Sequence, residues 1–197
     1  ILDEMPKGRK HIKTWLVEPE KRISAYGWIE KQIKETKNQV FIICPFIEES
    51  ETMQGVKAAV KEYERLKKKV FKNLKLGLLH GRLKSKEKDE VLGKFRNKRI
   101  DILVATPVVE VGIDIPNATI ILIEASERFG LSQLHQLRGR VGRGDKQSYC
   151  LLFTESKNPQ TAQRLKAMER MNVGEALAEL DLKMRGPGEI YGTMQHG

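Results

Sequence analysis

Cysteine is scarce in this 197-residue chain, which contains only Cys44 and Cys150, each inside an apolar stretch. A disulfide-stapled scaffold needs more cysteines, and these two are not spaced as metal ligands. We therefore expect two reduced thiols in the core of a cytoplasmic protein, with a single disulfide between them as the alternative. His80, His135 and His196 also lack ligand spacing, so no metal site is predicted.

Long hydrophobic runs are missing as well. No apolar stretch approaches the roughly 20 residues that a membrane-spanning helix needs. The opening residues, ILDEMPKGRK, contain no apolar segment of the kind found in signal peptides. A membrane partner is therefore not expected.

Acidic residues are outnumbered, because 36 lysines and arginines face 26 aspartates and glutamates, for a net charge of +10. Such a surplus favours a polyanionic partner, nucleic acid before a membrane surface; a merely soluble basic protein is the alternative. The stretch ERLKKKVFKNLK at 64–75 is basic enough to contact phosphates. A charge run on a long helix is more often a solvated face, and both interpretations stay open.

Apolar runs of strand length alternate with amphipathic helical stretches through residue 153. This alternation predicts an α/β fold, with a parallel sheet flanked by helices on both faces. The first helix is expected to face the sheet with Ile23, Tyr26, Ile29 and Ile33. The predicted strands are 11–17, 40–44, 75–80, 100–105, 119–123 and 149–153, and the predicted helices are 19–37, 52–70, 85–97 and 131–143, followed by a helical hairpin and a glycine-rich loop over 155–197.

Ligands of such sheets bind at the carboxyl ends of the strands. The segments that follow strands are therefore candidate sites, namely 45–51, 80–85, 106–116 and 124–131.

The segment QLHQLRGRVGRG (133–144) places three glycines beside three arginines. If 131–143 is one helix, Gln136, Arg140 and Arg143 share a face, and Gly139 and Gly142 leave that face bare enough for a large ligand. The arginine guanidinium can donate two parallel hydrogen bonds to phosphate oxygens. Arg140 and Arg143 are therefore candidate catalytic residues that stabilise charge on a transferred phosphoryl group. The alternative is a solvated basic helix end capped by glycine.

No segment of the chain is suited to hold a triphosphate by itself. A Walker loop, GxxxxGK[ST], is absent, and so is an acidic DExH string for Mg²⁺. The dinucleotide motif GxGxxG is also absent, which disfavours a metabolic α/β enzyme. Because the chain has candidate phosphate-binding arginines but no Walker loop, we expect it to supply only part of an active site. The residues that hold the triphosphate are expected outside this sequence.

Two long motifs resemble superfamily 2 helicases: ILVATPVVEVGIDIPNATIILI (102–123) is similar to motif V, and QLHQLRGRVGRG is similar to motif VI. Within that superfamily, the strings CPFIEESE (44–51), LHGRLKSKEKDEVLGKF (79–95) and MRGPGEIYGTMQHG (184–197) resemble the RecG family of bacterial DNA translocases. The resemblance implies a RecA-like second helicase lobe at 18–154. An interlobe linker and first strand precede it at 1–17, and a helical hairpin and translocation loop follow at 155–197.

The resemblance implies nucleotide-related roles for five residues. Arg140 and Arg143 match arginines that reach the γ-phosphate of ATP, with Gln136 at the same interface. Gly112 and Asp114 match motif V positions near the nucleotide, although Asp114 could instead cap a turn. ATP with Mg²⁺ is the implied cofactor, and the Mg²⁺ ligands are expected in a first lobe outside this sequence.

Contacts with nucleic acid are implied for Thr106, Gly81, Arg82 and Lys88. The alternatives are a strand-end hydroxyl for Thr106 and a solvated surface for the two cations. Pro107 stands where the family has threonine, and because proline lacks an N–H it cannot donate there.

The tail resembles the loop that couples ATP-driven lobe closure to movement on DNA. Arg185 and Gln195 match polar positions of that loop. The alternative is a chain end with no such role.

The function implied by the resemblance is that of the second motor lobe of an ATP-dependent double-stranded DNA helicase or translocase. The complete enzyme would remodel stalled forks and branched junctions in DNA repair and recombination, and this lobe alone would hydrolyse no ATP. The implied partners are double-stranded and branched DNA and the first lobe, within a monomer. The alternatives are the corresponding lobe of the transcription-repair coupling factor Mfd and a non-catalytic nucleic-acid-binding module.

Overall fold

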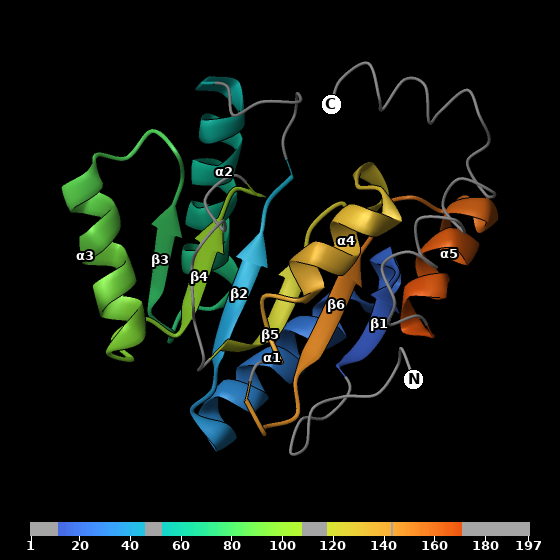
Figure 1. Ribbon diagram of the computed structural model, residues 1–197, viewed down its shortest axis with the longest axis horizontal. Helices are drawn as coiled ribbons and strands as arrows, with labels where there is room; N and C mark the ends of the chain where they lie inside the picture. The colour runs from blue at the N-terminus through green and yellow to red at the C-terminus, as the bar shows by residue number, and fades with distance from the viewer. Residues whose placement is uncertain (1–11, 46–52, 108–117, 143, 171–197) are drawn as a thin grey trace.

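The computed structural model describes residues 12–45, 53–107, 118–142 and 144–170 (Figure 1). The strands are β1 (Lys13–Val17), β2 (Gln39–Ile43), β3 (Leu76–Leu79), β4 (Ile102–Ala105), β5 (Ala118–Ile123) and β6 (Tyr149–Phe153). The helices are α1 (Arg22–Thr36), α2 (Met53–Arg65), α3 (Ser85–Arg96), α4 (Leu131–Arg138) and α5 (Pro159–Lys166), and the short helical turns are η1 (Pro19–Lys21), η2 (Leu66–Val70), η4 (Ser126–Arg128) and η5 (Ala167–Glu169).

The six strands form one sheet in the order β1-β6-β5-β2-β4-β3, and every neighbouring pair is parallel. Each residue of β2 and β5 is buried, as expected for strands that helices cover on both faces. All six strands were predicted from the apolar runs, and all six are confirmed. The predicted RecA-like α/β class is likewise confirmed.

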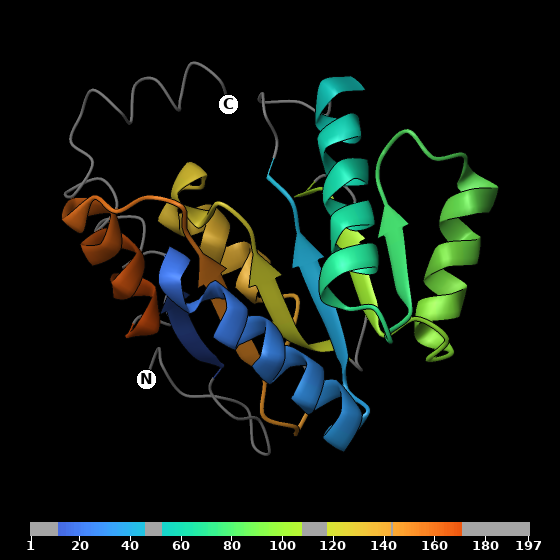
Figure 2. The ribbon, with the colours of Figure 1, turned by 180° about the vertical axis from the view of Figure 1, so that it is seen from behind.

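The helices form two layers, one on each face of the sheet (Figures 1 and 2). On one face, α1 and α2 pack against alternate strand residues such as Val40, Ile42 and Leu122. On the other face, α3, α4 and α5 pack against the residues between them, such as Phe41 and Ile121. Because successive side chains of a strand point to opposite faces, one strand supplies both cores.

The stripe with which α1 faces the sheet differs from the predicted one. Ile23 is 84% exposed, whereas Tyr26, Ile29 and Ile33 are buried. The expectation for Ile23 was wrong because the inward stripe follows positions i, i+4, i+7 and i+11 from Arg22. Arg22, rather than Ile23, therefore begins the inward face.

The long helix predicted at 52–70 is confirmed in position, but its last turn is wider than an α-helical turn. Residues 66–70 are π-helical, and the Phe71 N–H donates to the Leu66 carbonyl at 2.7 Å. The wider turn lets Leu66 and Phe71 both be fully buried. At the predicted start of the last helix, the Asn158 side chain caps α5 by accepting from the Gln160 N–H at 2.9 Å.

The two cysteines are free and buried, which confirms the expectation of core thiols. Burial raises the pKa of Cys150 to about 12. Within the described part of the chain, no helix is long and apolar enough to cross a membrane.

Candidate functional site

Helix α4 carries the first half of the glycine- and arginine-rich segment. Leu131, Leu134 and Leu137 lie at helical spacing and pack into the core beneath the helix. At the amino end of α4, the Gln133 side chain accepts from the Gly130 N–H at 2.9 Å, which satisfies one free donor of the first turn. The sequence thus fixes both the start of α4 and the face that it buries.

Arg138 is a structural residue rather than a phosphate ligand. Its side chain is buried, and Nη1 donates to Thr14 Oγ1 at 3.1 Å and to the Met168 carbonyl at 2.7 Å. Its Nη2 lies 3.1 Å from His135 Nδ1. Burial lowers the pKa of both Arg138 and His135, so a neutral His135 can accept from this guanidinium. Arg138 therefore ties α4 to β1 and to η5.

The helix ends at Arg138, five residues before the predicted end. Gly139 is its C-cap, and Arg140 lies in the following turn, with its N–H donating to the Leu137 carbonyl at 3.0 Å. The expected helical face shared by Gln136, Arg140 and Arg143 is therefore wrong. Gln136 lies on α4, Arg140 lies beyond it, and Arg143 is outside the described residues.

The two glycines also act differently from what was expected. Gly142 has φ +80°, which side chains rarely tolerate, and a Cβ there would lie 2.8 Å from Ile12 Cγ1. At Gly139 a Cβ would lie 3.3 Å from the Gln136 carbonyl oxygen. Gly142 thus serves a left-handed turn that packs against the Ile12 side chain rather than a bare face for a ligand, and Gly139 fits the helix-cap alternative.

Arg140 is consequently held between two anchored positions. Arg138 on one side and Val141 on the other are 3% and 2% exposed, whereas Arg140 is half-buried. The anchoring limits the motion of the backbone that carries the Arg140 guanidinium. A charged group held in this way loses little conformational freedom when it meets an anion.

The candidate nucleic-acid residues gather at the carboxyl ends of β3 and β4. The Thr106 N–H donates to the Leu79 carbonyl at 3.2 Å, which places the end of β4 beside the loop that contains Gly81 and Arg82. Arg82 is exposed, and its N–H donates to His80 Nδ1 at 3.2 Å. A cation on a loop at this edge suits a phosphate.

The structure places two of the expected DNA-contacting residues, Thr106 and Lys88, away from the exposed loop. Thr106 is 1% exposed, and because its N–H donates to the Leu79 carbonyl, this N–H is not available to a phosphate. A contact between the Thr106 hydroxyl and nucleic acid stays a prediction. Lys88 lies one turn into α3 and is half-buried, beyond the loop itself. Gly112 and Asp114 lie outside the described residues, as do Arg185 and Gln195.

The phosphate candidate Arg140 and the nucleic-acid candidate Arg82 lie near opposite ends of the row of strands. Gly142 packs on Ile12 and Ser148, so Arg140 is close to the amino ends of β1 and β6. Arg82 follows β3, four strand spacings from β6, a distance of roughly 20 Å. Arg140 therefore does not lie among the strand-end loops where ligands were expected, and the phosphate and nucleic-acid candidates belong to separate surfaces.

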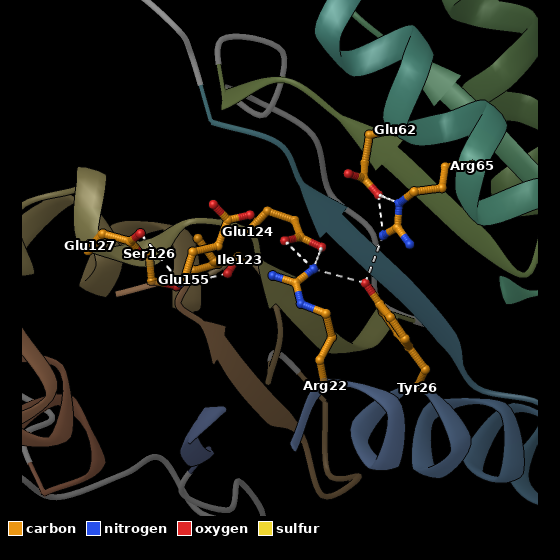
Figure 3. A network of polar contacts seen from close by, with 9 residues as sticks. All are labelled: Arg22, Tyr26, Glu62, Arg65, Ile123, Glu124, Ser126, Glu127 and Glu155. Carbon is orange, nitrogen blue, oxygen red and sulfur yellow. Dashed lines mark hydrogen bonds and ion pairs between the residues drawn. The ribbon is translucent and has the colours of Figure 1, made fainter. Parts of the chain in front are cut away.

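A polar network that sequence reasoning missed lies at the carboxyl end of β5 (Figure 3). Arg22 Nη1 is 3.2 Å from Glu124 Oε2 and donates to the Tyr26 hydroxyl at 3.1 Å. Arg65 donates to the same hydroxyl at 3.0 Å and to Glu62 Oε1 at 2.8 Å through Nε. The network joins α1 and α2 to the end of β5.

Glu124 is the least solvated member of this network. Burial raises the pKa of its carboxyl group to about 7, although the neighbouring Arg22 favours the charged form. Burial alone would lower the pKa of Arg22, but the Glu124 carboxylate and Tyr26 together raise it. The only sequence signals were a glutamate directly after the apolar run 120–123 and an arginine on the inward stripe of α1.

A cavity of about 160 Å³ adjoins the network. Its lining includes Cys44 and Pro45 after β2, Glu124 and Ala125 after β5, and Glu62 of α2. The chain leaves β2 toward α2 on one face and β5 toward α4 on the other, so the cavity lies at a switch point of the sheet. In the described ranges, no group of three or more histidine, cysteine, aspartate or glutamate side chains could hold a metal ion.

Comparisons with known proteins identify the fold and the group of relatives. Residues 24–145 match the helicase conserved C-terminal domain family. The whole chain is 53% identical to part of the ATP-dependent DNA helicase RecG of Synechocystis and 48% identical to part of the RecG of Thermotoga maritima. The chain spans 23% and 25% of those two proteins, about a quarter of their length.

Solved structures agree with these relatives. A structure described as RecG bound to a three-way DNA junction superposes with a TM-score of 0.75 and 46% identity, over 95% of this chain and 24% of that chain. Domain 2 of the DEAD-box helicase Mss116p, bound to an RNA duplex, superposes over 83% of this chain and 61% of that chain, with a TM-score of 0.57 and 24% identity. The second likeness concerns the fold alone.

Proposed function

Because the chain belongs to the helicase conserved C-terminal domain family and is similar to RecG helicases over its whole length, we propose that it is the second motor lobe of an ATP-dependent double-stranded DNA translocase. ATP is held by a first lobe outside these residues, and the present lobe completes the site. The lobe occupies 18–154, with the linker and first strand at 1–17 and the coupling element at 155–197.

The observation that carries this proposal is the anchored turn after α4. Arg138 is hydrogen-bonded to Thr14 and Met168, and Val141 and Gly142 are buried, so the backbone around Arg140 is held on both sides. A rigidly mounted arginine needs little reorganisation to stabilise charge on a phosphoryl group. If Arg140 merely belonged to a solvated helix end, the buried Arg138 before it and the left-handed Gly142 after it would not be needed.

In the completed site, Arg140 and Arg143 donate hydrogen bonds to γ-phosphate oxygens of ATP, and Gln136 lies at the same interface. Gly112 and Asp114 adjoin the nucleotide. Mg²⁺ would be held by residues of the first lobe and would supply positive charge beside the phosphates. Arginine chemistry fits this role, because its guanidinium forms paired hydrogen bonds to phosphate and stays charged.

The DNA-contacting surface is the carboxyl edge of β3 and β4. Arg82, Lys88 and the Gly81 backbone contact phosphates, and buried Thr106 holds this loop in place through its bond to Leu79. The solved relative bound to a three-way junction supports branched DNA as the substrate. We propose that the complete enzyme remodels stalled forks and junctions in repair and recombination, as a cytoplasmic monomer.

Alanine substitution of Arg140 or Arg143 in the full-length protein tests the proposal. Each should lower ATP turnover at saturating DNA by ~10³-fold or more, the usual contribution of an arginine finger, and should leave DNA affinity nearly unchanged. Lys31→Ala, on the exposed surface of α1 and outside every proposed site, is the control and should keep full turnover. Unchanged turnover in the Arg140 and Arg143 variants would refute the assignment.

The tail residues Arg185 and Gln195 are proposed to couple hydrolysis to movement on DNA. Arg185→Ala should therefore retain DNA-stimulated ATP turnover in the full-length protein and lose strand separation on a branched substrate. Parallel measurement of the two activities separates coupling from catalysis. An equal loss of both would contradict the coupling role.

A further inference from the structure

The amino edge of the sheet, opposite the proposed DNA surface, carries a dense group of cations. They lie on the α2–β3 and α3–β4 connections, at the lower ends of β3 and β4 in the left part of Figure 1. We call this group the amino-edge patch; its members, all exposed, are Lys69, Lys72, Lys75, Arg96, Lys98 and Arg99.

Backbone hydrogen bonds hold the two connections side by side. The N–H groups of Asp101 and Ile102 both donate to the Lys75 carbonyl, at 2.7 and 3.2 Å. The Lys75 N–H donates in return to Asp101 Oδ2 at 2.9 Å. The patch is therefore one continuous surface, although its residues come from two separate stretches of sequence.

The charge of the patch is not neutralised within the described residues. None of its six cations forms an ion pair there, and the carboxylate of Asp101, directly before β4, accepts from the Lys75 backbone N–H. Elsewhere on the same helices, exposed lysines do pair with glutamates one turn away, as in Lys68–Glu64 and Lys94–Glu90. The six cations of the patch, in contrast to these two neighbouring lysines, form no ion pair within the described residues.

One member of the patch stands where glycine would be less strained. Lys98 follows the end of α3 with φ 60°, in the left-handed region, and its N–H donates to the Phe95 carbonyl at 3.0 Å. Glycine is the usual residue at this position after a helix. A lysine here sacrifices stability and adds one more cation to an already repulsive group.

From these observations we propose that the amino-edge patch is a second nucleic-acid contact, which binds the phosphate backbone of duplex DNA at the edge of the lobe opposite to Arg82. The proposal rests on the proposed DNA translocase function. The patch lies at the amino ends of two neighbouring strands, β3 and β4, which are roughly 5 Å apart, and a duplex presents about three phosphate charges over that length. The positive charge of the patch complements these phosphates, and exposed lysine and arginine side chains suit sequence-independent phosphate contacts.

Charge reversal in the full-length protein tests the proposal, with affinity for a blunt linear duplex measured over a range of salt concentrations. The triple variant Lys69→Glu, Lys72→Glu and Arg99→Glu should bind the duplex at least ~10-fold more weakly at moderate salt. The slope of log affinity against log salt should become shallower by about 2 to 3, because each lost contact removes about 0.9. ATP turnover at saturating duplex should be unchanged.

The matched control changes the same net charge elsewhere: Lys21→Glu, Lys57→Glu and Lys61→Glu, all exposed and outside the patch. It should leave the salt slope unchanged. Equal weakening by both triple variants, or no weakening by either, would overturn the proposal. So would a patch variant that loses binding to polyglutamate and keeps duplex binding, since that result would indicate an acidic protein partner.

Two further measurements keep the result interpretable. Glutamine at the same three patch positions removes the charge without reversing it, so it perturbs the fold less. It should lower the affinity for the duplex by a smaller factor, and circular dichroism should confirm that the variant is folded. Arg140→Ala tests the motor separately, because it should remove ATP turnover and leave the salt slope intact. Failure of one proposal is therefore distinguishable from failure of the other.

Discussion

At the scale of single residues, the least expected finding is a glutamate withdrawn from water at the end of a central strand. Glu124 is 6% exposed and is paired with Arg22, whose Nη2 is buried without a hydrogen-bond partner in the described part of the chain. Removing one member of such a pair leaves the other charge buried and uncompensated, which is strongly destabilising. The pair thus depends on both members being present.

The raised pKa of Glu124 predicts how stability changes with pH. Unfolded glutamate releases its proton near pH 4.5 and native Glu124 near pH 7, so the native state binds more protons in between. Stability therefore falls as pH rises through this window, and the cost is complete above about pH 8. The free energy of unfolding of wild type relative to Glu124→Gln should fall by roughly 2–3 kcal/mol from pH 5 to pH 8.

Chemical denaturation of this chain at several pH values measures that difference. Glu35→Gln, on the exposed surface of α1, is the matched control and should run parallel to wild type. A constant gap between wild type and Glu124→Gln across the range would show that the carboxyl group is not withdrawn from water.

At the scale of elements, the turn after α4 decides where the catalytic candidate lies. Gly142 allows the chain to reverse against Ile12, and Arg138 fastens the helix beneath it. Arg164 reinforces the other end of α4 by donating to the Phe129 carbonyl at 3.1 Å and to the Glu127 carbonyl at 2.9 Å. The position of Arg140 thus depends on α4, β1 and α5 together.

Gly142→Ala should therefore destabilise this chain by about 1–3 kcal/mol, because it adds a strained φ and a clash with Ile12. Gly144→Ala is a suitable control, since a Cβ there meets no atom within 4 Å, and it should change stability far less. Urea denaturation of the two variants provides the comparison. Equal stabilities would mean that the turn is not as closely packed as described.

The elements themselves could be predicted from the sequence, whereas the environments of single polar residues could not. Length and composition identify β2 and β5, because the apolar runs 40–44 and 120–123 have the length of a strand and are rich in β-branched residues. The end of α4 was missed because Leu134, Leu137 and Val141 have helical spacing, although the helix ends at Arg138. The burial of Arg138, Thr106 and Glu124 depends on partners distant in sequence, such as Thr14, Leu79 and Arg22, which no local pattern reveals.

At the scale of the whole molecule, the sheet separates three surfaces. The carboxyl ends of β3 and β4 carry the loop with Arg82, the turn near β1 and β6 carries Arg140, and the opposite edge carries the amino-edge patch. Separate surfaces would suit the proposed motor lobe, which would contact ATP and DNA at different points of its cycle. The proposal also fits a basic chain with clustered arginines and no Walker loop within its sequence.

The most direct test of the account measures ATP turnover, in the presence of duplex DNA, by this chain, by a separately produced first lobe and by their mixture. Each part alone should be inactive and the mixture active, and Arg140→Ala in this chain should lower the activity of the mixture by ~10³-fold, with Arg140→Lys in between. Turnover by this chain alone, or a mixture indifferent to Arg140, would contradict the account.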